Sequence, residues 1–317
     1  MKIIKGLFLI SAIFMLTACT NNQDKSNDDS FTIYTTVYPL EDFAKKIGGD
    51  HVEVHSIYPP GADEHTFEPS QKDMMDLADA DLFLYIGLGL EGFVNKAEDI
   101  LKNEGVTMTA TGEGLDLEAE NHDDHEDHGH EDVHSEDGHH HDIDPHVWLD
   151  PVYSKEMAHK VYEVLADKLP KHKEEFKNNY DQLAADLDQL HQQFKKVVEN
   201  AEENEIFVSH AAYSYWEKRY GIEQTAIAGI SSSDEPSQQE LKALIDSAKQ
   251  KDVQYILFEQ NISSRLTEVV QKEIGAEALS LHNLSVRTEK EVKEEKDYFD
   301  LMNENIETLT KALNSKE

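Results

Sequence analysis

The chain has 317 residues, of which 29 are basic and 65 acidic, so its formal net charge is −36. This acidity excludes a nucleic-acid-binding protein, because contacts to phosphates need clustered lysine and arginine. A single cysteine excludes an intramolecular disulfide and a cysteine-rich zinc or iron–sulfur site. Hydrophobic residues make up 38% of the chain, enough to bury a core, and the length predicts about two domains.

The first thirty residues have the pattern of an export signal followed by a tether. Two lysines precede an apolar run over residues 7–16, and small residues lead to Cys19. This pattern predicts a signal peptide over residues 1–18. Residues 16–19 resemble the bacterial lipobox, which implies that Cys19 carries the lipid. We therefore expect a polar tether over residues 19–30, and a protein anchored at the extracellular face of the bacterial cytoplasmic membrane, as in Gram-positive cells.

The next part of the chain alternates between strand and helix patterns. Strands are expected over residues 31–37, 52–57, 81–86 and 106–109, with helices over 40–47, 70–80 and 91–103. Several of these strands are short, continuous apolar runs, which are typical of strands buried on both faces of a parallel sheet. The pattern predicts an N-terminal αβ lobe over residues 31–170.

A 33-residue acidic segment, residues 112–144, interrupts this lobe. It holds fourteen acidic residues and no lysine or arginine, and it cannot bury an apolar face, so we expect a mobile loop. Neutral imidazole binds zinc, copper and nickel, and eight histidines in this loop predict several weak, exchanging metal sites. The alternative is a solvated loop with incidental histidines. The eight are His122, His125, His128, His130, His134, His139, His140 and His141.

A long amphipathic helix is the clearest element in the sequence. Apolar residues recur at spacings of three and four, which predicts a helix over residues 171–199 within a linker over 171–203. Pro170 separates it from a helix over residues 153–168. At a rise of 1.5 Å per residue the helix spans roughly 40 Å, enough to run along two lobes. The alternative is an ordinary core helix within one domain.

The last part of the chain repeats the αβ pattern. Strands are expected over residues 205–209, 224–228, 253–258 and 276–281, and helices over 211–220, 237–251, 264–273 and 291–312. This pattern predicts a C-terminal αβ lobe over residues 204–317. The predicted fold class is α/β, with two αβ lobes built on mainly parallel four-stranded sheets and joined by the long helix.

Three histidines lie in strand-to-helix connections. His65 follows the second expected strand, His146 lies in a stretch fixed by two prolines, and His210 ends a strand of the second lobe. Ligands gather at the carboxyl ends of strands in open αβ sheets. We therefore expect these histidines to converge in an interlobe cleft. Taken singly, each is more often a hydrogen-bonded structural residue.

Three sequence elements carry a family resemblance. They are Gly-Ala-x-x-His-x-x-Glu-Pro-Ser at 61–70, Asp-Pro-His-x-Trp-Leu-Asp-Pro at 144–151 and Ser-His-x-x-Tyr at 209–213. Their order resembles the family 9 (cluster A-I) solute-binding proteins, the zinc and manganese receptors of bacterial ABC importers. The resemblance implies two lobes on a rigid helix, with a metal ion held between them by His65, His146 and His210. It also implies delivery of that ion to a membrane permease driven by an ATPase.

The fourth ligand is left open by the sequence. Many relatives place a carboxylate in the last strand-to-helix loop, where this chain has none and Ser285 is the nearest match. Water or Glu64 could complete a tetrahedron, and Glu259 is a weaker candidate. Manganese prefers oxygen-rich, higher-coordinate sites, so three imidazoles favour zinc, which the His-rich insertion of zinc-specific members also implies. Copper and nickel remain compatible with this ligand chemistry.

Other functions use the same features. Three histidines and a metal-bound water also describe a zinc hydrolase, for which Glu64, Glu68 and Glu259 are the candidate bases. No Gly-x-Ser-x-Gly nucleophile motif occurs. We expect a monomeric zinc receptor without enzymatic activity. The alternatives are an adhesin or zinc-buffering surface lipoprotein of the same fold, and a manganese receptor.

Overall fold

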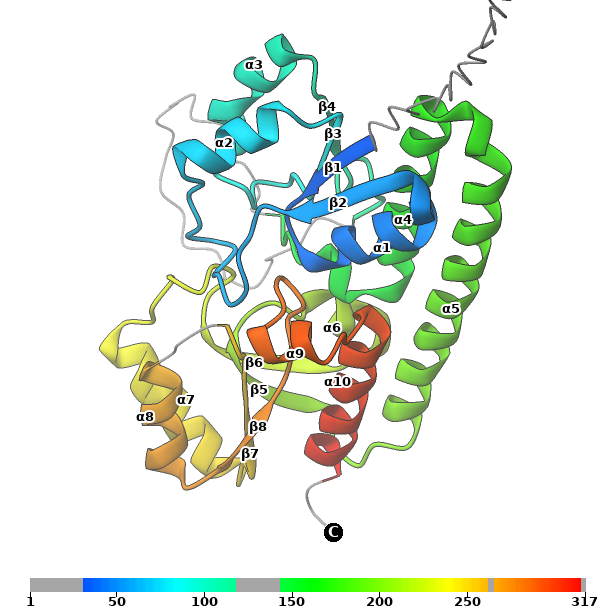
Figure 1. Ribbon diagram of the computed structural model, residues 1–317. Coiled ribbons are helices and arrows are strands. Elements are labelled where there is room, and N and C mark those ends of the chain that lie inside the picture. Colours follow the sequence, from blue (N-terminus) through cyan, green and yellow to red (C-terminus); the bar gives the residue numbers. More distant parts are fainter. Residues whose placement is uncertain (1–30, 118–142, 262–264, 315–317) are drawn as a thin grey trace, which may run out of the picture. The chain divides into compact units, whose positions relative to one another are not determined.

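The computed structural model describes residues 31–117, 143–261 and 265–314. Within them lie two four-stranded sheets, and every strand pair in both sheets is parallel (Figure 1). This confirms the predicted fold class of two αβ lobes. None of the described helices combines the length and the apolar character that a bilayer span requires.

The N-terminal lobe is built on the order β2-β1-β3-β4. Its strands are β1 (Phe31–Thr35), β2 (Val52–Ser56), β3 (Leu82–Tyr85) and β4 (Thr107–Ala110), and its helices are α1 (Tyr38–Gly48), α2 (Gln71–Ala78) and α3 (Val94–Glu104). The chain moves outward from β1 to β2 and then crosses back to β3. The carboxyl ends of β1 and β3 therefore form a switch point, where open αβ sheets bind ligands.

The C-terminal lobe repeats this topology in the order β6-β5-β7-β8. Its strands are β5 (Glu205–His210), β6 (Glu223–Ala228), β7 (Tyr255–Phe258) and β8 (Glu277–Ser280), with helices α6 (Ser214–Tyr220), α7 (Gln238–Gln250) and α8 (Arg265–Ile274). Here β5 and β7 form the switch point. Two of the candidate residues lie at it, since His210 ends β5 and Glu259 directly follows β7.

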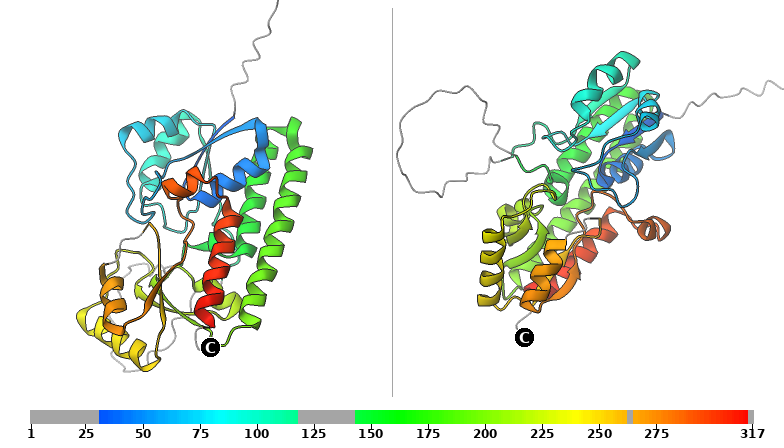
Figure 2. Two further views of the ribbon diagram at one scale, coloured as in Figure 1. Left: turned by 60° about the horizontal axis from the view of Figure 1, so that its bottom comes forward. Right: turned by 90° about the vertical axis from the view of Figure 1, so that its left-hand side faces the viewer.

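A pair of long helices, α4 (Pro151–Lys168) and α5 (Lys173–Glu199), follows the N-terminal lobe (Figures 1 and 2). α5 buries one apolar stripe, Phe176, Leu183, Leu187, Leu190, Phe194 and Val197. It contacts α1 and α4 along one part and α6 and α10 (Tyr298–Leu313) along another, so it spans elements of both lobes. α5 starts two residues later than predicted, because Pro170 begins a separate 3₁₀ turn, Pro170–His172.

The predicted helix over residues 291–312 is wrong at its start. The chain forms two helices there, α9 (Glu289–Lys293) and α10, separated at Glu295, whose φ is 54°. Each helix has its own capping box, from Thr288 with Glu291 and from Asp297 with Asp300. Each capping box stabilises the start of its own helix, so the chain forms two helices instead of one continuous helix.

Both ends of the acidic segment, at residues 112–117 and 143–144, belong to the described structure. Gly112 donates its backbone N–H to the Ile86 carbonyl at 2.9 Å, and Leu115 is 8% exposed. At the other end Asp144 is 2% exposed. The first residues of the stretch whose composition predicts a loop are therefore paired and packed, and its last residue is buried. Residues 118–142 lie outside the described part.

The connection between β8 and α9 is anchored at His282. Its N–H donates to Asn305 Oδ1 at 2.7 Å, and Asn305 Nδ2 donates back to the His282 carbonyl at 2.8 Å. The His282 Nε2 atom lies 3.2 Å from Glu291 Oε2. These contacts fix the position of the next residues, Asn283 and Ser285, which matter below.

The contact between His282 and Glu291 makes a pH-dependent contribution to stability. Burial by itself would raise the pKa of Glu291, but the hydrogen bond and charge of His282, together with Thr288, lower this pKa from 4.5 to about 2. A lowered carboxyl pKa stabilises the folded state above the unfolded pKa of about 4.5, and that stabilisation is lost as pH falls toward 2.

We predict that Glu291→Gln lowers the free energy of unfolding by about 1 kcal/mol at pH 7, a value that allows for solvent screening. Urea unfolding at a series of pH values should show the difference from wild type shrinking by more than half at pH 3. Glu289→Gln is the control, because that side chain is 82% exposed. An equal loss at pH 7 and pH 3 would contradict the ionic origin of the effect.

Candidate metal centre

Three separate backbone segments carry the candidate histidines. His65 lies in the loop after β2, where its N–H donates to Asp63 Oδ1 at 2.9 Å. His146 precedes the 3₁₀ turn Val147–Leu149 and donates its N–H to Asp144 Oδ1 at 2.9 Å. His210 is the last residue of β5. In two of the three cases an aspartate two residues earlier fixes the histidine backbone, a local Asx-type contact.

The structure brings these three histidines together. His65 Nε2 lies 3.2 Å from His146 Nε2, and His146 Nε2 lies 3.3 Å from His210 Nε2. Around a tetrahedral zinc ion with Zn–N bonds of 2.0–2.1 Å, two nitrogens lie about 3.3 Å apart. The two distances therefore match two edges of a zinc tetrahedron, and one ligand atom from each of the three histidines lies within 4.8 Å of the others. His146 and His210 are fully buried.

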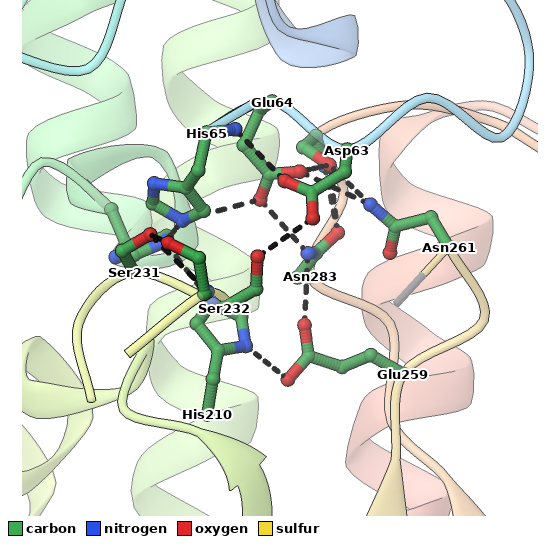
Figure 3. Close-up of polar contacts among 12 residues, drawn as sticks. Asp63, Glu64, His65, His210, Ser231, Ser232, Glu259, Asn261 and Asn283 are labelled. Carbon is green, nitrogen blue, oxygen red and sulfur yellow. Dashed lines mark hydrogen bonds and ion pairs between the residues drawn. The ribbon is translucent and has the colours of Figure 1, made fainter. Parts of the chain in front are cut away.

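Two carboxylates hold the opposite nitrogens of these rings. Asp144 Oδ1 lies 2.7 Å from His146 Nδ1. Glu259 Oε1 lies 2.5 Å from His210 Nδ1, as Figure 3 shows. A carboxylate at Nδ1 keeps the proton there and leaves the Nε2 lone pair free for a metal ion. Asp144 is itself held by the hydroxyl of Ser214 and by Tyr215, whose hydroxyl donates to the Asp144 carbonyl at 2.5 Å.

Glu64 supplies a fourth donor beside the imidazoles. Its Oε1 lies 3.9 Å from His65 Nε2, and one ligand atom from each of Glu64, His65, His146 and His210 lies within 4.8 Å of the others. The carboxylate is buried and accepts hydrogen bonds from Asn283 at 3.0 Å and Asn261 at 3.1 Å (Figure 3). It also accepts one from the Ser285 hydroxyl at 2.8 Å. Ser285, the nearest sequence match to the carboxylate of some relatives, therefore lies against Glu64.

Glu259 lies on the other side of His210. One of its oxygens contacts Nδ1 of that ring and the other accepts from Asn283 Nδ2 at 2.9 Å. This is the side away from the Nε2 atoms, so the structure places Glu259 as the residue that orients His210, and not among the four clustered donors. Glu68 is outside the cluster as well, with a side chain 67% exposed.

The sequence pattern missed the residue that links these carboxylates. Asn283 Nδ2 donates both to Glu64 of the N-terminal lobe and to Glu259 of the C-terminal lobe. The backbone carbonyl of Asn283 accepts a hydrogen bond from Trp148 Nε1 at 2.6 Å. The available signal was an asparagine in the connection after β8, at the carboxyl edge of a parallel sheet. Asn283 thus couples all three chain segments around the site.

The environment sets the protonation of two of the rings. Burial, and then the neighbouring His146 and His210, lower the pKa of His65 to about 3, so this imidazole is neutral at pH 7. Burial alone would lower the pKa of His210, but the charge and hydrogen bond of Glu259 raise it overall. Burial also raises the pKa of Glu64. A cation at the centre would favour the carboxylate form of Glu64 and the neutral forms of His65 and His210, because it attracts carboxylates and lone pairs and repels an imidazolium.

The remaining predicted residues lie outside the described part of the chain. They are Cys19 and the eight histidines of the acidic segment. The structure therefore places the proposed buried site and is silent on lipid attachment and on metal capture by the loop.

Comparison with known proteins places this geometry in a family. The model for the family described as "Zinc-uptake complex component A periplasmic" matches residues 33–312. The high-affinity zinc uptake system protein ZnuA of Bacillus subtilis is 33% identical over 313 residues, which cover 97% of each chain. The zinc-binding lipoprotein AdcA of Streptococcus pneumoniae is 34% identical over 312 residues, 98% of this chain and 60% of AdcA, so the chain spans about three fifths of that relative.

Solved structures agree with the sequence matches. The crystal structure of the Zn(II)-bound ZnuA-like domain of S. pneumoniae AdcA superimposes with a TM-score of 0.73 at 28% identity, covering 90% of this chain and 99% of that domain. The laminin-binding protein Lmb of Streptococcus agalactiae, described as bifunctional with adhesin and metal-transporting activity, gives a TM-score of 0.76 at 27% identity, covering 90% of this chain and all of Lmb. The chain therefore belongs to the ZnuA family of zinc-uptake components.

Proposed function

We propose that this protein is the receptor of a zinc uptake system, which captures Zn²⁺ outside the cell and delivers it to the permease of an ABC importer. The observation that carries the proposal is the position of His146 Nε2, which lies 3.2 Å from His65 Nε2 and 3.3 Å from His210 Nε2. Neutral imidazoles this close repel through their lone pairs unless a proton or cation lies between them. The choice of cation is supported by the relatives, since AdcA is described as zinc-binding and ZnuA as a zinc uptake protein.

Glu64 completes the tetrahedron in this proposal. A buried Zn²⁺ with three neutral ligands would carry two uncompensated positive charges, and burying charge is costly unless it is paired. The Glu64 carboxylate, held by Asn283 and Ser285, supplies one negative charge and one oxygen ligand. Three nitrogens and one oxygen suit four-coordinate zinc better than manganese, which prefers more oxygen ligands. A water molecule is the alternative fourth ligand.

The protein acts as a carrier and not as an enzyme in this proposal. Glu64 and Glu259 are both occupied by hydrogen bonds within the site, and Glu68 is exposed, so none of the candidate bases is poised to activate a water. A His-Glu-x-x-His sequence does occur once, from His130 to His134. It lies in the acidic segment, which lacks the apolar periodicity of the helix on which metalloproteases carry this motif.

The regions outside the described residues complete the proposal. Lipid attachment at Cys19 would hold a monomer at the outer face of the cytoplasmic membrane, as the lipoprotein name of AdcA supports. The histidines and carboxylates of residues 118–142 would raise the local concentration of zinc and speed its arrival, since a cluster of like charge attracts counter-ions. Transfer to the buried site would follow.

Surface adhesion is the second candidate function, because Lmb is described as both adhesin and metal transporter. The two functions are separable by zinc uptake. Cells that lack this protein should lose high-affinity uptake if it is the receptor, whereas unaffected uptake would favour the adhesin or zinc-buffering role.

We predict that His146→Ala weakens zinc binding about 100-fold or more, which corresponds to about 2.8 kcal/mol. The variant removes one of three imidazoles, together with the contact that this ring makes to the buried Asp144 carboxylate. Competition with a chromophoric chelator measures the affinity. His159→Ala is the control, because that side chain is 45% exposed and lies outside the cluster. Unchanged affinity of His146→Ala would remove His146 from the ligands.

Glu64→Gln should weaken zinc binding roughly tenfold to a hundredfold, because the amide keeps the shape of the side chain but loses its negative charge. Isothermal titration with competing chelator provides the measurement, and Glu68→Gln provides an exposed control. If Glu64→Gln binds zinc as tightly as the wild type, water is the fourth ligand.

Deletion of residues 118–142 should leave one tightly bound zinc ion and lower the total zinc stoichiometry. Native mass spectrometry with metal analysis measures both. The deletion must stop before residue 143, because Asp144 orients His146. Loss of the tight ion in the deletion variant would mean that the loop donates a ligand, and it would contradict the separation of capture from tight binding.

A further inference from the structure

A second cluster of metal-ligating side chains lies outside the site described above. His51 ends the 3₁₀ turn Gly49–His51, directly before β2. His172 ends the turn Pro170–His172, and Glu175 lies in the first turn of α5. One ligand atom from each of these three side chains lies within 4.8 Å of the others. The cluster thus joins two segments that are more than a hundred residues apart.

The two imidazoles stack on each other and pack against a buried phenylalanine. The rings of His51 and His172 stack with centroids 3.7 Å apart and an interplanar angle of 28°. Phe176, which is fully buried, contacts both rings at centroid distances of 5.9 Å. Because this packing already restrains both imidazoles, binding of a ligand would cost less side-chain entropy.

A simple ion pair accounts for only part of this arrangement. His51 Nε2 lies 3.0 Å from Glu175 Oε2. Among the described residues the imidazole of His172 has no hydrogen-bond partner, although it stacks directly on His51. Two imidazoles and one carboxylate are a common ligand set for zinc, and imidazole selects zinc, copper and nickel over calcium and magnesium.

The cluster is open to solvent and separate from the interlobe site. The side chain of His51 is 28% exposed and that of Glu175 is 54% exposed. His51 precedes β2, whereas His65 follows its other end, so the five residues of β2, about 16 Å of strand, lie between them. The two clusters therefore lie at opposite ends of β2.

We propose that His51, His172 and Glu175 form a second, weaker binding site for zinc or a similar imidazole-preferring divalent cation. Three protein ligands leave a fourth position to water, and the partial exposure lets the ion exchange with solvent. A bound ion would connect the turn after α1 to the start of α5, beside the hydrogen bond of 2.9 Å from Asn179 Nδ2 to the Ile47 carbonyl. It would thereby clamp the N-terminal lobe to the long helix.

Zinc protection of single histidines from diethylpyrocarbonate, mapped by peptide mass spectrometry on the full chain, tests this site. The readout is specific to each residue, so zinc held elsewhere does not obscure it. We expect zinc, but not calcium, to protect His51 and His172, at a higher zinc concentration than that which fills the interlobe site. His159, which has one carboxylate neighbour 3.8 Å away and no place in the cluster, is the internal reference and should remain reactive.

Glu175→Gln should raise the zinc concentration for half-protection of His51 and His172 about tenfold or more. Glu174→Gln, an exposed carboxylate in the same helical turn, is the matched control and should leave it unchanged. Retention of one tightly bound zinc by both variants in native mass spectrometry would establish that they are folded. Equal protection of His159, or the same protection midpoint in both variants, would overturn the proposal.

Discussion

The close approach of three buried imidazole Nε2 atoms is the constraint on which the rest of this structure depends. Three Nε2 atoms, in two pairs 3.2 and 3.3 Å apart, lie in a buried environment, where electrostatic repulsion is stronger than in water. The protein holds them there through contacts made behind the rings, above all the carboxylates at Nδ1 of His146 and His210. The folded chain therefore holds the three nitrogens in positions that a tetrahedral cation would stabilise.

The fold explains how such distant residues meet. Parallel strands end on the same side of each sheet. The C-terminal lobe offers His210 and Glu259 at the ends of β5 and β7, and the N-terminal lobe offers Glu64 and His65 from the loop after β2. Asn283 then ties the two carboxylates together, and Trp148 ties Asn283 to the segment of His146. Because one amide group serves both lobes, the site and the contact between the lobes are the same hydrogen-bond network. Capture and release of an ion by this network would involve both lobes.

Much of this architecture was predictable from periodicity alone. The apolar stripe of the long helix and the alternation of strands and helices predicted both lobes, because these patterns report burial directly. The break between α9 and α10 was missed, since the residues of the two capping boxes, at 288–291 and 297–300, look like the polar face of one helix until the backbone at Glu295 is seen. The meeting of the three histidines was expected from their strand-to-helix connections, and their role as metal ligands was implied by the family resemblance. No local pattern contains distances across the lobes. The sequence therefore could not predict that Asn283 and Ser285 bind Glu64, or that Glu259 contacts Nδ1 of His210.

The central claim is that His65, His146 and His210 bind one zinc ion between the lobes. Anomalous diffraction at the zinc absorption edge, from crystals of the protein loaded with one equivalent of Zn²⁺, tests it most directly. The account predicts one dominant peak about 2.0–2.1 Å from Nε2 of each of the three rings. A dominant peak elsewhere in the molecule, or one that contacts fewer than three of these nitrogens, would contradict it.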